Sequence, residues 1–249
     1  MNFLNLAAVG TEREWQEALS KELENGCEGI ILQCGDPDFT DILLAKVPSN
    51  LPVVLYNSAS ESPRVRGRVG NDLKEEGRLA AEAVLEYGRA GDTVLLAEPK
   101  HASYMIKEIH KAAQVVLEQA EVPVERVVLA GEEQAKAFVK KLEKEGGKTL
   151  FSADTTLLQA LGTACEKTET DLPLFGACYS GSLRNFVERG IITAVTAHRT
   201  YEAGYFCMKK MENLLNGSLG KDVTTVETVV VTAENLYDKG IESVVFPYI

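Results

Sequence analysis

Apolar runs of strand length alternate along this chain with segments whose apolar residues repeat at helical spacing. Most of the runs are continuous rather than alternating, which is typical of parallel strands buried on both faces. They cover residues 2–9, 29–34, 51–56, 93–97, 126–130, 149–153 and 173–177. The regular succession of a strand and then a helix predicts a parallel sheet with helices on both faces, the α/β class.

Capping residues mark the starts of several expected helices. Thr11 and Glu14 have the spacing of a capping box, and Trp15 opens an apolar periodicity behind them. Asp72 precedes an apolar face that ends at Gly88, so we expect it to cap a helix. Further helices are expected over residues 103–121, 132–145, 156–165 and 182–189.

Charge and hydropathy narrow the possible partners and location. The 249 residues carry a formal net charge of −11, which repels nucleic-acid phosphates and anionic membrane surfaces. Nucleic acid is therefore not an expected partner. No apolar run approaches the roughly 20 residues that span a bilayer, and the first six residues lack the pattern of a signal peptide. We expect an extracytoplasmic protein, periplasmic or lipid-anchored at the cell surface, if an export signal has been removed, and a cytoplasmic protein otherwise.

The sequence contains no motif of a common enzyme or metal centre. It has no Walker A pattern, no G-x-S-x-G, no G-x-G-x-x-G and no H-E-x-x-H. Its three histidines have no ligand-like spacing, and its five cysteines form no C-x-x-C. We therefore expect no catalytic residue, no metal and no cofactor.

Two segments that join strand ends to helix starts resemble a known family. The first runs from Val69 through Asn71 and Asp72 to Gly77, and the second covers residues 197–204. Open α/β sheets bind small molecules at such positions. Both segments resemble the hinge crossings of the type I periplasmic sugar-binding proteins and LacI-type repressors. The resemblance extends over nearly the whole chain, through residues 27–32, 51–57, 150–154, 190–198, 201–217 and 229–236.

This resemblance implies both a fold and a function. The fold is two Rossmann-like, doubly wound lobes joined by a multi-crossing hinge. The N-terminal lobe would comprise residues 1–70 and 199–230, and the C-terminal lobe residues 71–198 and 231–249. The function is noncatalytic capture of a small polar ligand, such as a sugar or sugar derivative, in the cleft between the lobes. The protein would serve an ABC importer, with the transporter permease as its partner. The alternative is a ligand-sensing domain of a signalling receptor, with a signalling partner, or of a transcription regulator.

The chain departs from the family pattern at its start. Residues 2–9 resemble the family's second strand, so a first strand and helix of roughly 30 residues have no counterpart. That strand would be the central one of its sheet, and an empty slot leaves backbone groups unpaired. We therefore expect a homodimer, a donated strand, or a rearranged strand such as residues 244–246 to complete the N-terminal lobe.

The expected ligand residues also depart from the family pattern. Many sugar-binding members carry Asp-Arg after the fourth strand, where this chain has Asn57 and Ser58. Guanidinium and carboxylate groups fix sugar hydroxyls, so the identity of the ligand stays open. The candidate ligand contacts are Asn57, Asp72, His101, Tyr104, Asp154, Tyr179, His198 and Arg199.

Several of these candidates have an equally good structural explanation. Asp72 and Asp154 stand where they would cap helices, and His198 stands where it would form a hydrogen bond within the hinge. His101 and Tyr104 fall on a loop and a first helical turn, where exposed residues are common. Tyr179 would offer an aromatic face on which a ligand stacks.

Overall fold

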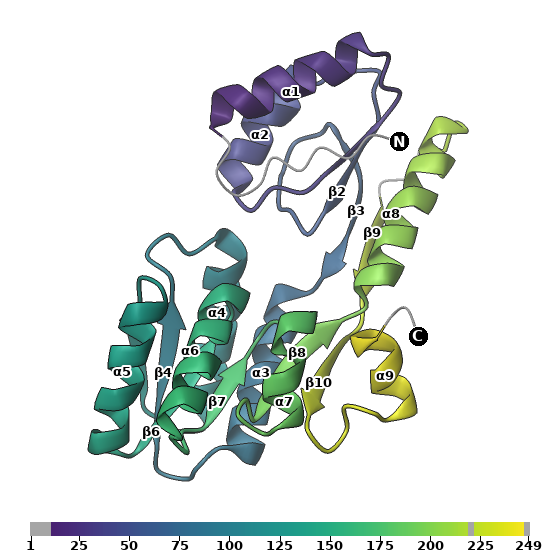
Figure 1. Ribbon diagram of the computed structural model, residues 1–249. Helices are drawn as coiled ribbons and strands as arrows, with labels where there is room; N and C mark the ends of the chain where they lie inside the picture. The colour runs from purple at the N-terminus through teal and green to yellow at the C-terminus, as the bar shows by residue number, and fades with distance from the viewer. Residues whose placement is uncertain (1–10, 219–221, 247–249) are drawn as a thin grey trace. The chain divides into compact units, whose positions relative to one another are not determined.

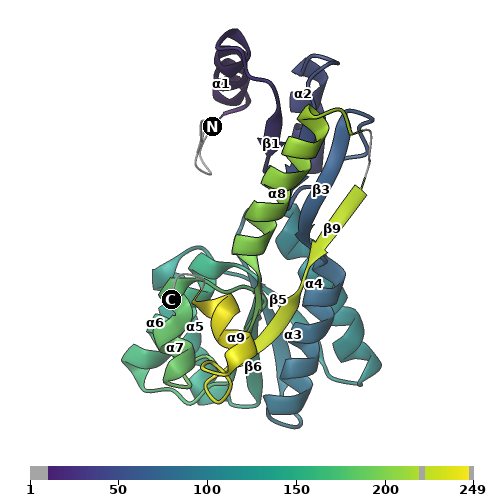
Figure 2. The same cartoon turned by 90° about the vertical axis from the view of Figure 1, so that its right-hand side faces the viewer.

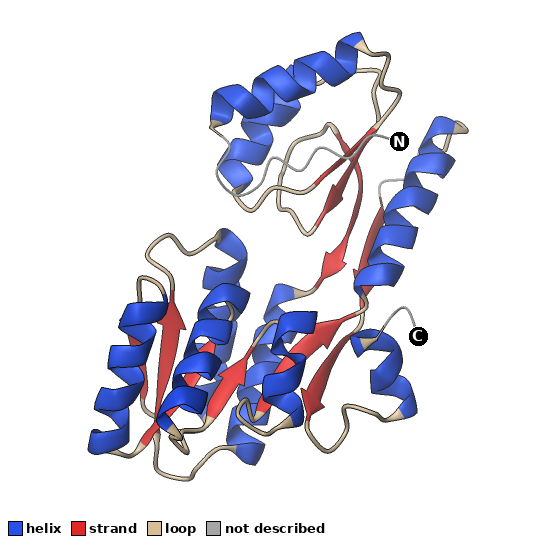
Figure 3. Cartoon of the chain, in the orientation of Figure 1, coloured by secondary structure: helices blue, strands red, loops and turns tan. Residues whose placement is uncertain are grey.

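Three crossings of the chain divide it into two units, at Gly70–Asn71, Thr200–Tyr201 and Val226–Glu227. Unit 1 comprises Met1–Gly70 and Tyr201–Val226, and unit 2 comprises Asn71–Thr200 and Glu227–Ile249. The structure is a computed structural model that describes residues 11–218 and 222–246 (Figure 1). Both units combine parallel strands with helices on both faces, which confirms the predicted α/β class (Figure 3).

Unit 1 is built on a four-stranded sheet whose first three strands run parallel. Its order is β1 (Ile30–Leu32), β2 (Val53–Tyr56), β3 (Val65–Asn71) and β9 (Asp222–Val226). Within the described residues, β1 pairs with β2 alone. The strand expected over residues 2–9 lies outside the described residues, and the expected homodimer or donated strand stays a prediction.

Helices cover both faces of the sheet in unit 1. On one face α8 (Thr200–Leu215) packs along the sheet through Cys207 and Met211 (Figure 2). On the other face lies α2 (Pro37–Lys46), whose Leu44 joins a core with β2. The capping box predicted in front of α1 (Glu12–Glu24) is present. No described helix is long and apolar enough to cross a membrane.

The sheet of unit 2 has six strands, and its winding reverses beside β4 (Thr93–Glu98). The chain leaves β4 for β5 at one side and then returns to β6 at the other side of β4. This is a topological switch point, where open α/β sheets bind ligands at the carboxyl ends of their strands. The full order is β10 (Thr228–Thr232), β8 (Ala194–His198), β7 (Leu174–Gly176), β6 (Lys148–Ser152), β4 and β5 (Val124–Val128). Only the pairing of β10 with β8 is antiparallel among the described pairs.

Alternate residues of the unit 2 strands enter two separate cores. Leu96 and Phe151 pack under α3 (Leu73–Tyr87) and α4 (Tyr104–Gln119). Leu95 and Leu150 enter the core on the opposite face. The helices of that core are α5 (Glu132–Glu145), α6 (Thr155–Thr168), α7 (Arg184–Glu188) and α9 (Lys239–Val245).

Two expectations about the last third of the chain are corrected by the structure. The helix expected over residues 182–189 is divided into a 3-10 turn, Gly181–Leu183, and the short helix α7. The run 244–246 was expected to be available as a strand, but Val244 and Val245 end α9 and are buried in unit 2. They share a helical face with Ile241, so packing on that face favours helix over strand. This run therefore does not complete the sheet of unit 1.

Candidate functional site

A buried glutamate of unit 2 contacts Asn71, the last residue of β3, and two residues of β8. Glu76 lies on the inward face of α3 and is 2% exposed. Thr196 Oγ1 donates a hydrogen bond of 3.1 Å to its Oε1. Asn71 Nδ2 donates to its Oε2, and His198 Nδ1 lies 4.0 Å from Oε1. The carboxyl group therefore meets side chains from the end of β3 and the end of β8.

Burial controls the protonation of this cluster. It raises the pKa of Glu76 to about 7, although the hydrogen bonds from Thr196 and Asn71 act in the opposite direction. Burial also lowers the pKa of His198. Below pH 7 the cluster therefore holds its proton on the carboxyl group of Glu76 rather than on the imidazole.

Two predicted ligand residues cap the helices that follow β3 and β6. Asp72 Oδ1 accepts hydrogen bonds from the backbone N–H groups of Lys74, at 2.9 Å, and Glu75, at 3.2 Å. Asp154 Oδ1 accepts one from Leu157 N at 2.7 Å. The structural explanation of both aspartates is confirmed, and their contact with a ligand stays a prediction.

The loop after β4 carries two further candidates. His101 is exposed on this loop, and Tyr104, 37% exposed, is the first residue of α4. Asp154 follows β6, the neighbour of β4 in the sheet. Candidates therefore stand at both strands that flank the switch point.

The segment after β7 contributes a buried thiol and a buried hydroxyl. Burial raises the pKa of Cys178 to about 12, and the charges of Glu76 and Asp154 add to the effect. Cys178 thus lies close enough to both carboxyl groups to sense their charge. The hydroxyl of Tyr179 is buried and has no hydrogen-bond partner in the part of the chain that the structure describes. Buried hydroxyls without a hydrogen-bond partner are uncommon, because burial of an unpaired polar group destabilises the fold.

Two candidates remain, Arg199 in unit 2 and Asn57 in unit 1. The guanidinium of Arg199 contacts Glu227 Oε2 through Nε, at 3.1 Å, and Ser243 Oγ through Nη1, at 3.2 Å. Asn57 belongs to unit 1, where it follows β2 with a φ of 43°, a left-handed conformation that asparagine tolerates. Its backbone N–H donates to Val69 O at 3.0 Å.

Glu76 and His110 were not predicted as site residues. They are polar residues on the core-facing sides of α3 and α4. Both are buried, at 2% and 0% exposure. Their sequence signal is a polar residue at an apolar position: Glu76 lies three residues after Leu73, and His110 four after Ile106. A titratable group on the core-facing side of a helix marks a candidate site, since it needs a buried partner.

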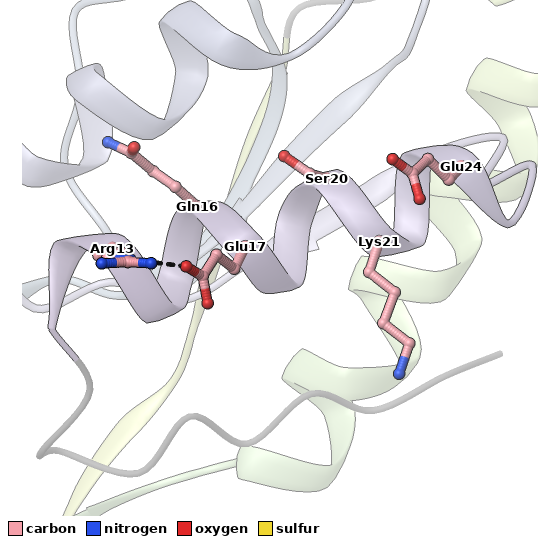
Figure 4. A pocket seen from close by; sticks show the side chains of 6 residues that line it. All are labelled: Arg13, Gln16, Glu17, Ser20, Lys21 and Glu24. Atoms are coloured by element: carbon pink, nitrogen blue, oxygen red, sulfur yellow. Dashed lines mark hydrogen bonds and ion pairs between the residues drawn. The ribbon is translucent and has the colours of Figure 1, made fainter.

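A shallow surface hollow is lined by side chains of α1 (Figure 4). Its lining comes from this one helix: Arg13, Gln16, Glu17, Ser20, Lys21 and Glu24. The ion pair of Arg13 with Glu17, at 2.7 Å, is solvent-exposed. The face of one helix does not surround a ligand, so we assign no role to the hollow. The described residues contain no group of three or more side chains that could hold a metal ion.

Solved structures with the same fold are similar to this chain over most of its length. An ABC transporter solute-binding protein from Agrobacterium vitis, with bound D-fucose, is 18% identical, with a TM-score of 0.83 over 98% of this chain and 88% of that one. A carbohydrate transporter solute-binding protein from Agrobacterium radiobacter, in complex with D-arabinose, is 14% identical, with a TM-score of 0.78 over 92% and 82%. A complex of the TorS sensor domain with TorT, without ligand, is 16% identical, with a TM-score of 0.79 over 95% and 84%.

At these identities the solved structures show the fold, and the family follows from the sequence. Curated protein sequences give no match. The sequence profile of the periplasmic binding protein domain, in contrast, matches residues 5–219. That match covers most of both units, and it agrees with the type I fold of the structural neighbours. The chain therefore belongs to the periplasmic binding protein domain family.

Proposed function

We propose that this protein binds a small polar ligand, a sugar or sugar derivative, without catalysing a reaction. In this proposal it is the solute-binding component of an ABC importer, acts outside the cytoplasm and hands its ligand to a transporter permease. Membership of the periplasmic binding protein family supports this role. So do the sugars bound to two of its structural neighbours.

The observation that carries the proposal is the set of polar groups at the carboxyl ends of the unit 2 strands. Asp154 follows β6, Tyr179 follows β7, and His198 ends β8. A carboxylate accepts hydrogen bonds from sugar hydroxyls, whereas a phenol and an imidazole both donate and accept. Binding would give the buried Tyr179 hydroxyl the hydrogen-bond partner that the described residues do not provide.

The remaining candidates extend the proposed contacts. Asp72 and the pair His101 and Tyr104 stand at the ends of β3 and β4, and Asn57 and Arg199 complete the proposed set. Arg199 already contacts Glu227, so a bound ligand would compete with that ion pair. The tyrosine rings would stack on the apolar face of a sugar.

A sensing role is the second candidate, because one structural neighbour is a sensor complex. Deletion of the gene separates the two roles. If the protein serves an importer, the deletion abolishes uptake of the radiolabelled sugar that the purified protein binds. If it serves a sensor, uptake continues, and the transcriptional response to that sugar is lost.

Calorimetric titration of the purified chain tests ligand binding itself. The panel contains D-fucose, D-arabinose, D-tagatose, D-ribose, D-galactose and D-glucose, with glycine as a chemically unrelated control. We expect saturable 1:1 binding of at least one monosaccharide and none of glycine. Absence of binding across the panel would count against the proposed ligand class.

Asp154→Asn then tests the site. Asparagine keeps an oxygen that can cap α6, but it loses the charge that strengthens hydrogen bonds to sugar hydroxyls. We expect affinity to fall about tenfold, with little change in stability. Asp238→Asn is the matched control: Asp238 is exposed at the start of α9, without a side-chain capping bond. Equal affinities of the two variants would remove Asp154 from the site.

A further inference from the structure

We propose that His110 is a positioning residue for ligand binding, which attaches the backbone after β6 to α4 near the switch point and thereby fixes Asp154. This inference rests on the proposed function in so far as Asp154 contacts the ligand. Its structural part, the attachment of the segment after β6, is independent of any ligand.

The first contact of His110 is with the backbone that leads into Asp154. His110 lies on the inward face of α4 and is 0% exposed. Its Nε2 accepts a hydrogen bond of 3.2 Å from the backbone N–H of Ala153. Ala153 stands between Ser152, the last residue of β6, and Asp154, the N-cap of α6. A single side chain of α4 therefore holds the backbone one residue before the proposed ligand contact.

This contact also assigns the tautomer of the ring. A ring nitrogen that accepts a hydrogen bond carries no proton, so the proton of the neutral imidazole is on Nδ1. Nδ1 lies 3.5 Å from Oε2 of Glu98, the last residue of β4. Arg126 of β5 places Nη1 3.9 Å from the same oxygen. The two nitrogens of one ring thus face the ends of two neighbouring strands.

The strand pairing explains why this attachment is needed. β4 and β6 pair from Thr93 and Lys148 as far as Leu96 and Phe151, and the pairing stops there. Beyond this point β4 continues to pair with β5. Ala153 lies beyond the last residue pair of β4 and β6, so its N–H has no partner in β4. His110 Nε2 accepts the hydrogen bond of this N–H instead. Without the imidazole, a backbone donor in a nearly buried residue, 8% exposed, would lose its partner.

Burial keeps the imidazole in the form that this contact requires. It lowers the pKa of His110 to about 4, and the nearby charge of Arg126 acts in the same direction. The charged groups at the ring are Glu98 of β4, whose Oε2 lies 3.5 Å from Nδ1, and Arg126 of β5, which contacts the same carboxyl oxygen. Phe151 packs beside it, with ring centroids 5.5 Å apart. The ring therefore remains a hydrogen-bond acceptor at neutral pH.

Two substitutions of His110 distinguish the effect of its hydrogen-bond acceptor from the effect of its side-chain volume. His110→Leu fills similar space without an acceptor, whereas His110→Gln supplies an amide oxygen that can accept the N–H of Ala153. Ile106→Val is the control for a small loss of packing on the same face of α4. None of the three substitutions replaces Asp154 or Leu157, the residues of the capping bond.

Hydrogen exchange of the Ala153 amide, measured by nuclear magnetic resonance, tests the structural part. We expect exchange to be about tenfold faster in His110→Leu and to return to within about twofold of the wild type in His110→Gln. The Ala177 amide, which donates to Ser152 O, serves as internal reference. The wild-type ring should also show a protonated Nδ1 and an unprotonated Nε2 in its nitrogen spectrum. Unchanged Ala153 exchange in His110→Leu, or a proton on Nε2, would overturn the proposal.

Titration with D-fucose tests the consequence for binding. We expect affinity to fall about tenfold in His110→Leu, to recover in His110→Gln and to stay within about twofold of the wild type in Ile106→Val. An equal loss in Ile106→Val would show general loosening of the unit and would refute a positioning role. If the wild type binds no sugar of the panel, the proposed function fails, while the exchange measurement still decides whether His110 fixes Ala153.

Discussion

The hydroxyl of Thr196 donates a 3.1 Å hydrogen bond to the carboxyl oxygen Oε1 of Glu76, 120 residues earlier in the chain. Both side chains are buried in unit 2. Asn71 donates to the other oxygen of the same carboxyl group. Asn71 adjoins the first crossing between the units, and Thr196 lies shortly before the second. The carboxyl group of Glu76 therefore bonds to side chains close to two of the crossings. A change in its protonation should change the free energy of unfolding.

Stability should fall as the pH rises through the range in which Glu76 ionises. Burial raises its pKa from an ordinary 4.5 to about 7 in the folded state. Between these values the folded protein holds a proton that the unfolded chain has released. The stabilisation is thus fully present below pH 4.5 and is lost as the pH approaches 7. We expect the loss between pH 5 and pH 8 to be about 2 to 3 kcal/mol.

Glu76→Gln isolates this effect, because glutamine has nearly the same shape and does not titrate. The free energy of unfolding is measured in urea at pH 5 and pH 8 for both proteins. The wild type should lose the stated amount relative to the variant. His110 and His198, whose pKa values burial lowers, produce the opposite slope and contribute to both proteins. Parallel pH profiles of the two proteins would show that Glu76 is ionised throughout.

Thr196→Val should destabilise the protein more at pH 8 than at pH 5. Valine matches the shape of threonine, but it leaves Oε1 of Glu76 without its donor, and a bond to a charged group contributes about 1.5 to 3 kcal/mol. At pH 5 the carboxyl group is protonated, so we expect a smaller loss there. Thr149→Val is a matched control, since Thr149 is buried in the same sheet and donates to Asp92 at 2.9 Å. A Thr196→Val cost that is the same at both pH values would contradict the assigned protonation of Glu76.

Cys178 should resist alkylation in the native protein. Burial raises its thiol pKa to about 12, so at pH 8 its thiolate fraction is about a thousandfold below that of a thiol with the ordinary value of 9. We expect iodoacetamide at pH 8 to label Cys178 only after denaturation, as read by peptide mass spectrometry. Cys27, whose side chain is also half-buried, is the reference in the same digest. Labelling of Cys178 at the rate of Cys27 would mean that its thiol is not desolvated.

The order of elements could be predicted from the sequence because apolar runs and capping residues are local signals. The expected runs 93–97 and 149–153 correspond to β4 and β6, and the expected cap Asp72 begins α3. The run 244–246 was misread because three residues do not separate a strand from the end of a helix. Its packing with Ile241 in the core of unit 2 decides the question, and that contact is not a local signal.

The candidate site was only partly predictable, for a related reason. Strand ends and helix caps identified Asp72, Asp154 and His198 from neighbouring residues alone. Glu76 and His110 are defined by partners far away in the chain, Thr196 and Ala153. The periodicity of a helix shows which polar residue faces the core. It does not show which residue will be the hydrogen-bond partner, because that depends on the order of the strands in the sheet.

Gly77→Ala should destabilise unit 2 by about 2 kcal/mol. A Cβ at Gly77 would lie 2.4 Å from Ile109 O and 2.7 Å from Ala112 Cβ, so α3 and α4 are in contact at this glycine. Relief of the overlap costs about 1 to 3 kcal/mol, partly offset by the better helix propensity of alanine. The overlap also falls on the residue before His110, so a shifted α4 should speed exchange of the Ala153 amide. Gly240→Ala is the matched control, because a Cβ there meets nothing within 4 Å, and we expect equal or slightly greater stability. Urea unfolding at pH 7 compares the two variants, and equal stability would show that α3 and α4 can separate at Gly77 without cost.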